Sequence, residues 1–569
     1  MYQTNAESGI RSIAARCLTV GAYHLAVRPM GISKKLNPSD PVTTTKANLP
    51  LVRSTSFAVT LACLVMAGCA VGPDFKKPAA PDVARYTDHA LSNTATSANV
   101  SGGEAQRFTN GADIPGDWWT LFHSAPLNAL IEQSLKSNAD LKAAQAALLV
   151  ASETTKAGRG AFYPSVSGSF SSSREKDPPG SLAPVPSNNA YRYDLFTPQL
   201  SISYAPDIFG LNRRTVESLQ AQEQAVRFQT IATQVTLSTN VVAAVVQEAS
   251  LQAQVDATRQ LVDINTHMLK ILQYQLSKGY VGRLDVAAQE SQLAQVVTTL
   301  PPLIKQLAQQ KDLLAVLVGQ FPNQAPAGQF DLATLQLPLD LPVSLPSKLV
   351  AQRPDVLQAE ANMHAASAQI GVATANRLPN IALTADVGST ALAMGQVFKS
   401  GTGFWNIGAA ITAPIFQGGT LMHQERAAKA AYVEAAEQYR STVLTAFQNV
   451  ADTLTALEQD ADGLKAAAHA ADAAKVTLDL SQRQWKAGYA NYLSLLSAEQ
   501  GYQQARITLV QAQANRFADT AALFQALGGG WWNRADSAEA DSNQRSIHQA
   551  GVNQINSGSA NSMQVKNEK

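Results

Sequence analysis

Two long helical patterns dominate the order of apolar and polar positions along the chain. Residues 211–278 contain neither glycine nor proline, and residues 420–487, which begin 209 positions later, contain only Gly463. Each pattern is 68 residues long, and at 1.5 Å per residue such a helix spans roughly 100 Å. A globular helix averages about 11–12 residues. Lengths of this kind therefore predict helices that pack as coiled coils.

A heptad seam supports this prediction. In the first pattern its positions alternate in steps of four and three, with two polar interruptions: Leu251, Val255, Thr258, Val262, Asn265, Leu269, Leu272 and Leu276. In the second pattern the corresponding positions carry smaller side chains: Leu464, Ala467, Ala471, Ala474, Leu478, Ser481 and Trp485. Such a ladder is the contact face of a coiled coil. A helical bundle has similar stripes, but the helix length favours the coiled coil.

Both long patterns end in related turns. Residues 278–284 read KGYVGRL and residues 487–493 read AGYANYL, again 209 positions apart. A glycine after the last helical residue is a typical C-cap, so we expect positive φ at Gly279 and Gly488. Further helices are predicted at 283–300 and 493–527. The chain thus contains two internal repeats, each with a long helical hairpin.

Each long helix is preceded by a pair of alternating segments. They cover 165–170 and 198–204 in the first repeat, around a Pro-rich loop at 177–186, and 380–387 and 405–411 in the second. Strict alternation predicts strands with one apolar and one polar face. A soluble sandwich would alternate in the same way. Four strands that lead into helices of about 100 Å favour membrane strands around a wet lumen instead.

The number of strands has a consequence for assembly. Four strands cannot close a membrane barrel, because eight is about the minimum. Several copies of the chain must then share one barrel, although the strand count does not choose how many. No segment after residue 68 offers 18 uncharged apolar residues, so we predict no spanning helix.

An apolar segment near the N-terminus ends at a cysteine. Residues 54–68 carry no charge, and Cys69 follows Ala67 and Gly68. The length suits the apolar core of a signal peptide and is short for a membrane helix. The pattern resembles a bacterial lipoprotein signal, which predicts that Cys69 carries lipid as the first mature residue. An ordinary secretory signal with an incidental cysteine is the alternative.

Composition narrows the possible functions. Only one of the three cysteines follows the signal, which excludes an internal disulfide in the mature chain. The 44 basic and 43 acidic residues nearly cancel, so no nucleic-acid footprint is visible. The histidines lack metal-binding spacing, and Gly528-Gly529-Gly530 follows a helix, which makes it a helix terminator and not a phosphate loop. We predict no enzyme, no metal and no cofactor apart from the covalent lipid.

Taken in order, several stretches resemble the outer-membrane factors of tripartite efflux pumps, in the NodT lipoprotein branch of the TolC-like family. The resemblance covers nearly all of residues 69–532. The matching stretches are Cys69 to Phe75, Asp117-Trp118-Trp119, Leu127 with Leu130 and Ile131, Asn138 to Leu141, Tyr204 to Arg214, Arg353 to Val356, Leu378-Pro379, Pro414 to Gly419 and Phe524 to Trp531. Pro206 departs from the family pattern. No single motif is decisive, but their ordered combination is specific.

The resemblance implies a TolC-like α+β membrane protein. Each protomer of a homotrimer would give four strands to one 12-stranded β-barrel and two hairpins to a long α-helical coiled-coil barrel. It would sit in the outer membrane, extend into the periplasm, and receive substrate from an inner-membrane pump of the RND type through a periplasmic adaptor. The turns that would meet the adaptor comprise Gly279, Tyr280, Val281, Gly282, Leu284, Gly488, Tyr489, Asn491 and Leu493.

A closed tip needs contacts that break at modest cost, and exposed charge pairs are worth only about 0–1 kcal/mol. The local candidates for such a gate are Arg283, Asp285, Arg483, Lys486 and Tyr489. A solvated helix face is the alternative for each of them. Many relatives have an acidic residue where this chain has Ala490, so a ring of acids is not predicted at that level.

The predicted organisation is a leader at 1–68, an acylated strap at 69–115, a first repeat at 116–318, a linker at 319–344, a second repeat at 345–532 and a disordered polar tail at 533–569. The predicted function is export of small toxic compounds through a passive duct. Two alternatives stay open: an exit duct for secreted protein or polysaccharide, and a structural lipoprotein without a pore.

Overall fold

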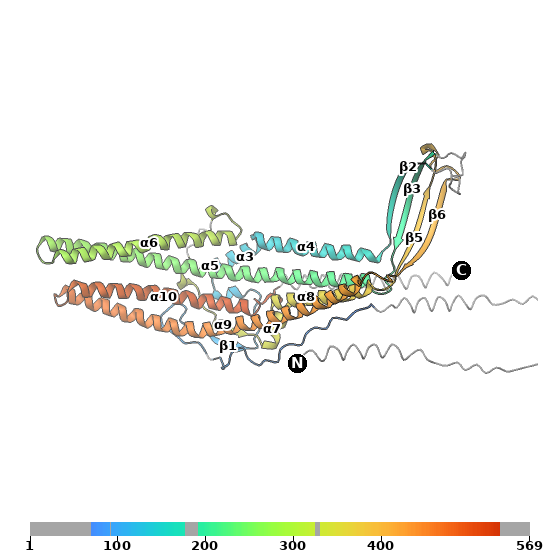
Figure 1. Cartoon of the computed structure of the whole chain (residues 1–569). Helices are drawn as coiled ribbons and strands as arrows, with labels where there is room; N and C mark the ends of the chain where they lie inside the picture. The colour runs from blue at the N-terminus through green and yellow to red at the C-terminus, as the bar shows by residue number, and fades with distance from the viewer. Residues whose placement is uncertain (1–69, 92, 177–191, 325–329, 535–569) are drawn as a thin grey trace, which may run out of the picture. The chain divides into compact units, whose positions relative to one another are not determined.

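The computed structural model describes residues 70–91, 93–176, 192–324 and 330–534 (Figure 1). The first repeat comprises α3 (Ala125–Ser137), α4 (Ala139–Arg159), β2 (Ser165–Lys176), β3 (Arg192–Tyr204), α5 (Leu211–Ser277) and α6 (Arg283–Leu317). The second comprises α7 (Pro346–Gln352), α8 (Pro354–Ala375), β5 (Asn380–Ser389), β6 (Gly403–Thr412), α9 (Thr420–Lys486) and α10 (Tyr492–Ala526). The short elements are β1 (Arg107–Asn110), β4 (Asp340–Val343), η1 (Trp118–Phe122), η2 (Gly160–Phe162), η3 (Pro322–Gln324), η4 (Leu332–Thr334), η5 (Met394–Gln396) and η6 (Trp531–Asn533).

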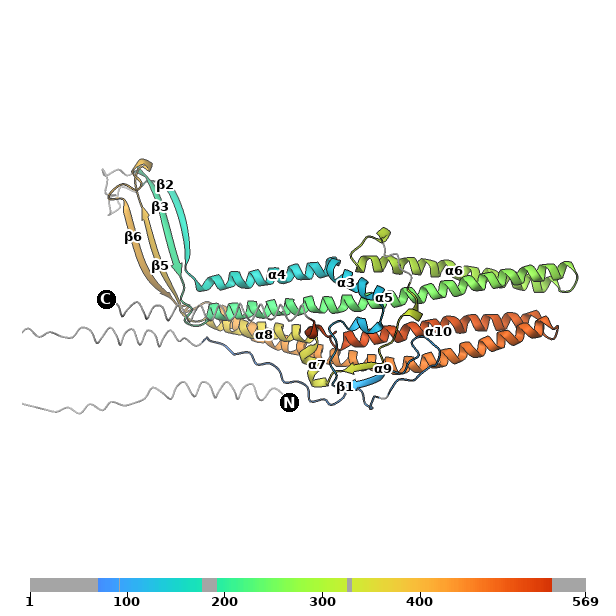
Figure 2. The ribbon, with the colours of Figure 1, turned by 180° about the vertical axis from the view of Figure 1, so that it is seen from behind.

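The two repeats pair their helices in the same way. α5 lies along α4 and α6, and α9 lies along α8 and α10 (Figures 1 and 2). α5 also packs against α8 and α10, which joins the first repeat to the second. The predicted long helices and the helical hairpin of each repeat are therefore confirmed.

The predicted end of the first hairpin's second helix is wrong. α6 does not stop at Leu300 but continues through Pro301 and Pro302 to Leu317. A proline removes one helical hydrogen bond and costs about 3 kcal/mol in a helix interior. Apolar packing beyond the prolines offsets this cost, because Leu307 is buried against Leu251 and Val255 of α5. Tertiary contacts have overridden the local signal.

All four predicted strands form, and they join in one antiparallel sheet with the order β2-β3-β5-β6. Each strand is longer than its predicted segment. Three register pairs illustrate the apolar face: Val166 opposite Ile202, Leu200 opposite Val387, and Val387 opposite Trp405. The other face carries pairs such as Ser167 opposite Ser201 and Asp386 opposite Asn406. The predicted two-faced alternation is confirmed, and the predicted loop at 177–186 lies outside the described residues.

The apolar face of the sheet is exposed in the single chain. Trp405, Ile407 and Ile411 of β6 are each at least 72% exposed, and Phe170 of β2 is 57% exposed. β2 and β6 are the two edges of the sheet. The sheet thus presents an uncovered apolar surface together with two edges whose backbone groups can pair with another strand.

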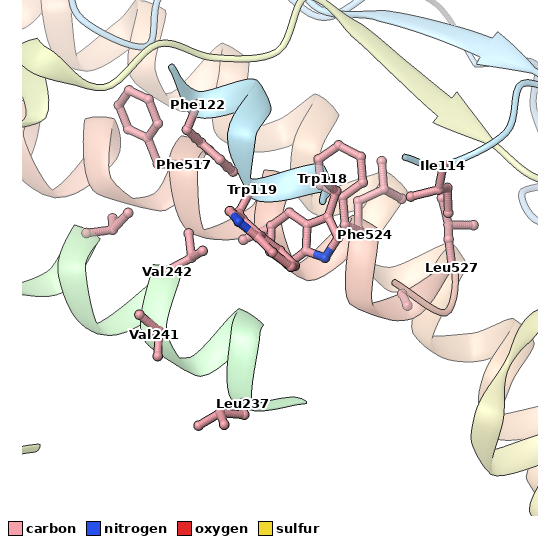
Figure 3. Close-up of a cluster of buried hydrophobic side chains, with 14 of the residues drawn as sticks. Ile114, Trp118, Trp119, Phe122, Leu237, Val241, Val242, Phe517, Phe524 and Leu527 are labelled. Carbon is pink, nitrogen blue, oxygen red and sulfur yellow. The ribbon is translucent and has the colours of Figure 1, made fainter. Parts of the chain in front are cut away.

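The largest apolar core lies where the two hairpins meet the short elements. Trp118 of η1 is 1% exposed and stacks on Phe524 of α10 with 5.1 Å between ring centroids. Figure 3 shows Phe122 and Phe517 beside this stack, and Val241 of α5 nearby. The Asp117-Trp118-Trp119 motif therefore anchors the core of the helical body.

The heptad ladders are confirmed as contact faces. Every predicted position of both ladders is buried or half-buried. The polar Asn265 of α5 is buried, and its backbone carbonyl and side-chain oxygen both accept hydrogen bonds from the Gln289 amide of α6, at 2.9 and 3.0 Å. A paired amide of this kind fixes the register of two helices, because any shift would leave buried polar groups unpaired.

Candidate functional site

The two hairpin turns have the same backbone design. The amide of Tyr280 donates to the Gln275 carbonyl and that of Tyr489 donates to the Gln484 carbonyl, both at 2.9 Å. Gly279 and Gly488 both have a φ of +78°, as predicted. This is the Schellman ending of a helix, which needs a residue in the left-handed region after the cap. The repeat of the sequence is thus a repeat of backbone geometry.

The helices that follow are capped by short polar side chains. The Asp285 carboxylate accepts a hydrogen bond from the Gly282 amide at 3.0 Å, and the Asn491 side chain accepts one from the Ser494 amide at 2.9 Å. Both contacts satisfy donors that a helix start leaves free. Asp285, a predicted gate candidate, therefore has a structural task within its own turn.

The structure brings the two predicted turns together. Leu272 of α5, Val286 of α6, and Tyr492 and Leu495 of α10 form one buried cluster. Trp485 of α9 packs edge-on against the Tyr492 ring, with 6.3 Å between centroids. Both turns therefore lie at the same end of the paired hairpins (Figure 1).

Apolar and aromatic side chains point into solvent at this end. Tyr280 is 79% exposed, Leu284 is 74% exposed and Tyr489 is 89% exposed. Leu493 is also exposed, whereas Val281 is half-buried against the shared cluster. The predicted tip residues thus divide into glycines and caps that shape the turns and side chains that are free for contact. Their contact with an adaptor stays a prediction.

The remaining gate candidates are exposed. Arg283, Arg483, Lys486 and Tyr489 lie on the solvent side of the two turns. Among the described residues, no ion pair joins any of the four predicted charged gate residues to a partner. Their role in a gate stays a prediction.

The sequence interpretation missed a buried carboxyl group in α10. Glu499 is 4% exposed, and burial raises the pKa of its carboxyl to about 7. A signal was present, because Tyr492, Leu495, Glu499, Tyr502 and Arg506 follow the four-and-three spacing of a heptad ladder. A charged residue inside such a ladder is buried by the packing of the helix face.

A second polar group missed from sequence is Arg516 of α10. It is fully buried and donates to the Leu457 carbonyl at 2.9 Å and to the Thr94 hydroxyl at 3.2 Å. Burial lowers the pKa of its guanidinium. One turn further on, burial and the neighbouring Asp460 carboxyl raise the pKa of Asp519 to about 7. Arg516 thus ties the N-terminal segment to both helices of the second hairpin.

The first described residues are held at the junction between sheet and helices. The Val71 amide donates to the Phe209 carbonyl at 3.0 Å, and Arg214 donates to the Val71 carbonyl at 3.1 Å and to the Asp74 carboxylate at 2.7 Å. A side chain on Gly210, whose φ is +81°, would collide with Ala70. Cys69 itself lies outside the described residues.

Two other kinds of feature, a metal centre and a membrane-spanning helix, are absent from the described part of the chain. There, no group of three or more His, Cys, Asp and Glu side chains is placed to hold a metal ion. No described helix combines the length and apolar character needed to cross a membrane. Gly528, Gly529 and Gly530 all have positive φ directly after α10, which confirms that they terminate a helix.

Comparison with known proteins places these features in a family. The sequence profile of the family described as "Outer membrane efflux protein" matches residues 130–320 and 345–529. The "Probable efflux pump outer membrane protein TtgC" of Pseudomonas putida is 28% identical over 488 residues, 85% of this chain and 96% of that protein. The "Pyoverdine export outer membrane protein OpmQ" of Pseudomonas aeruginosa is 28% identical over 421 residues, 73% of this chain and 87% of that protein.

A solved structure agrees with the sequence comparisons. The outer-membrane channel OprN superposes with a TM-score of 0.72 and 25% identity, covering 81% of this chain and all of that one. The match includes the arrangement of paired hairpins and a strand sheet described above. The TolC-like α+β fold expected from the sequence is therefore confirmed.

Proposed function

Since the chain belongs to the outer membrane efflux protein family and is an outer-membrane efflux channel, we propose that it is the passive exit duct of a tripartite pump for small toxic compounds. The main support is the exposed apolar face of the sheet, whose strands β3 and β6 lead into two 67-residue helices. Helices of that length place the turns roughly 100 Å from the sheet. The geometry suits a passage that begins in the periplasm and ends in the membrane.

The open edges of the sheet support a homotrimer. β2 and β6 are the sheet's edge strands, and unpaired edges are unfavourable in lipid. Three copies joined edge to edge make twelve strands, which is enough to close, whereas four are too few. The apolar face would then meet lipid and the polar face, with Ser167, Ser201 and Asn406, would line a wet lumen.

The exposed tip supports docking of partners at the other end of the hairpins. Tyr280 and Tyr489 offer aromatic surface on two turns of equal geometry. Two like turns per protomer would give six similar contacts in a trimer for a periplasmic adaptor. The energy for transport would come from an inner-membrane pump of the RND type, because a duct only has to open.

Lipid on Cys69 would add an anchor beside the sheet. Ala70, the next residue, packs against Gly210 at the start of α5. The acyl chains would thus emerge at the level where the strands end. One or two acyl chains anchor a protein without spanning the bilayer. The lipid would supplement the strands, which do the spanning.

We expect Cys69→Ser to abolish incorporation of radiolabelled palmitate, because serine lacks the thiol that takes the diacylglyceryl group. Immunoprecipitation after labelling of growing cells measures it. The matched control is Cys63→Ser, which should leave the label unchanged. Labelling of the Cys69→Ser protein would contradict a lipoprotein and favour an ordinary secreted one.

The proposed export function is tested by deleting the gene and measuring susceptibility to dyes, antibiotics and solvents. We expect increased susceptibility, restored by the wild-type gene. Unchanged susceptibility to all three would contradict efflux of small toxic compounds.

Conductance of the purified protein in planar bilayers is the second measurement. A protein that never conducts, even with its tip charges replaced, would contradict a duct and favour a structural lipoprotein.

Replacing both Gly279 and Gly488 with valine should impair assembly with the adaptor. A Cβ at either position meets no atom within 4 Å, so the cost comes from the positive φ alone. A β-branched residue in that region costs about 1–3 kcal/mol. Co-purification with the adaptor should fall. Gly463→Ala, inside α9, is the control, and full assembly of the double valine variant would contradict the role of the turns.

A further inference from the structure

A cavity lies between the two hairpins, next to the apolar cluster that joins the two turns, and Leu478 borders both. Its volume is about 60 Å³, which is room for more than a single water molecule. Three helices line it: α5 with Ala257, Gln260, Leu261 and Ile264, α9 with Leu478 and Gln482, and α10 with Glu499, Tyr502, Gln503 and Arg506. The cavity therefore belongs to both repeats.

Glu499 is the unusual member of this lining. It is 4% exposed, and neither of its carboxylate oxygens has a hydrogen-bond partner among the described residues. A buried carboxylate without a partner is strongly unfavourable. The one cationic side chain of the lining, Arg506, contacts two other lining residues instead of Glu499: its guanidinium donates to Gln260 at 3.5 Å and lies over the Tyr502 ring at 6.0 Å.

We propose that this cavity binds a small organic ammonium ion, with Glu499 as its counterion. The apolar side chains of Leu261, Ile264 and Leu478 suit the alkyl groups of such a ligand. The Tyr502 ring adds a face that attracts cations. A hard inorganic cation takes six or more oxygen ligands, most often from carboxylates, carbonyls and water. Here Glu499 is the one carboxyl group of the lining and stands beside the apolar side chains of Leu261, Ile264 and Leu478, which suits an organic cation better. An alkylammonium ion needs one opposite charge and an apolar wall.

The position of the site gives binding a structural consequence. The ligand would touch α5 of the first hairpin and α9 and α10 of the second. It would hold the two hairpins together by neutralising a charge buried between them. The buried cluster of Leu272, Val286, Tyr492 and Leu495 joins the hairpins one to two helical turns further on. A ligand in the cavity would therefore also stabilise the positions of the two hairpin turns relative to each other.

Binding should depend on pH in a defined direction. The lining residues from α5 and α9 carry no titratable group, and those from α10 are Glu499, Tyr502 and Arg506. Tyr492, two ladder steps before Glu499, lies on the same face of α10, and burial together with the nearby Glu499 charge raises the pKa of its hydroxyl. The pKa of the Glu499 carboxyl is about 7, so the carboxylate that binds the cation predominates above that pH. Affinity should therefore be high at pH 8 and low at pH 5.5.

The experiment is saturation-transfer NMR on the full-length protein in a neutral maltoside detergent. The probes are choline and its uncharged carbon isostere 3,3-dimethylbutan-1-ol, at pH 8 and pH 5.5. We expect transfer to choline at pH 8, at least a fivefold smaller signal at pH 5.5, and none to the isostere. Equal transfer to both probes, or none to choline, would overturn the proposal.

Variants assign the signal to the site. Glu499→Gln should abolish choline transfer at pH 8, and Glu290→Gln, at an exposed acid of α6, should leave it unchanged. Retained binding in Glu499→Gln would overturn the proposal. So would loss of the wild-type signal in 150 mM sodium chloride, which would make the site one for an inorganic ion. Unchanged far-UV circular dichroism of Glu499→Gln shows that the variant is folded.

A variant of Arg506 provides the last test of the proposal. Arg506→Gln should retain choline binding, because Arg506 is engaged with Gln260 and Tyr502. Binding that arises only after Arg506 is replaced would overturn the proposal, since it would identify Arg506 as the internal counterion of Glu499.

Discussion

Replacing Trp118 with alanine should lower the free energy of unfolding by about 3–5 kcal/mol. The indole is 1% exposed, stacks on Phe524 of α10 and meets the Trp119 ring edge-on at 5.9 Å. Removing it leaves a cavity where η1, α5 and α10 converge (Figure 3). Neighbouring rings relax only partly into such a space, because the helices around them are held by other contacts.

The measurement is thermal unfolding in mild detergent, followed by far-UV circular dichroism. The midpoint of Trp118→Ala should fall clearly, and Trp118→Phe should fall less because it keeps part of the stack. Phe321→Ala is the matched control, since Phe321 is 74% exposed. If the two alanine variants melt alike, the cluster around Trp118 does not stabilise the fold as described.

Replacing Glu499 with glutamine should stabilise the protein at pH 8 and have little effect at pH 4.5. Burial raises the carboxyl pKa in the folded chain to about 7, above the ordinary value of 4.5. The folded state then binds the proton more tightly than the unfolded state. The stabilising contribution of the protonated Glu499 carboxyl is fully present below pH 4.5 and is lost as the pH rises through about 7. The loss is up to about 3 kcal/mol, from 1.36 kcal/mol per pKa unit.

Glutamine removes this loss because it cannot ionise. The experiment compares unfolding midpoints of the wild type and the variant from pH 4.5 to pH 8.5, without added amines. Asp519, whose pKa is raised in the same direction, is present in both proteins and cancels in the comparison. Glu290→Gln serves as the control. A pH-independent difference between the wild type and Glu499→Gln would contradict a buried, titrating carboxyl.

Short-range patterns were sufficient for the turns of the two hairpins and for the two faces of the sheet. The ends of α5 and α9 follow from Gly279 and Gly488, because a helix that closes with a Schellman turn needs a residue at positive φ. The two faces of the sheet follow from alternation, because neighbouring side chains of a strand point to opposite sides. The family resemblance then supplied the function, since motifs such as Asp117-Trp118-Trp119 recur in order.

Other features depended on contacts between residues far apart in sequence. α6 passes Pro301 and Pro302 because Leu307 packs on α5, a gain that no local rule contains. Asp285 proved to be a cap of its own turn. The joining of both turns in one cluster also required the fold, because the repeats are separate in sequence and equal patterns do not say whether they touch.

The chain's local patterns alone establish two repeats, four two-faced strands and two hairpins of coiled-coil helices. They do so because periodicity and turn chemistry act over a few residues. Packing alone decides which polar groups lose water. In sequence, Arg516 looks like an ordinary helix-surface residue, and the ladder that contains Glu499 does not say which side chains cover it. Both are buried where α10 meets its neighbours. Burial depends on which side chains pack around a group, and these come from distant parts of the sequence. For Glu499 and Arg516, burial shifts the pKa and limits which hydrogen-bond partners can reach the side chain.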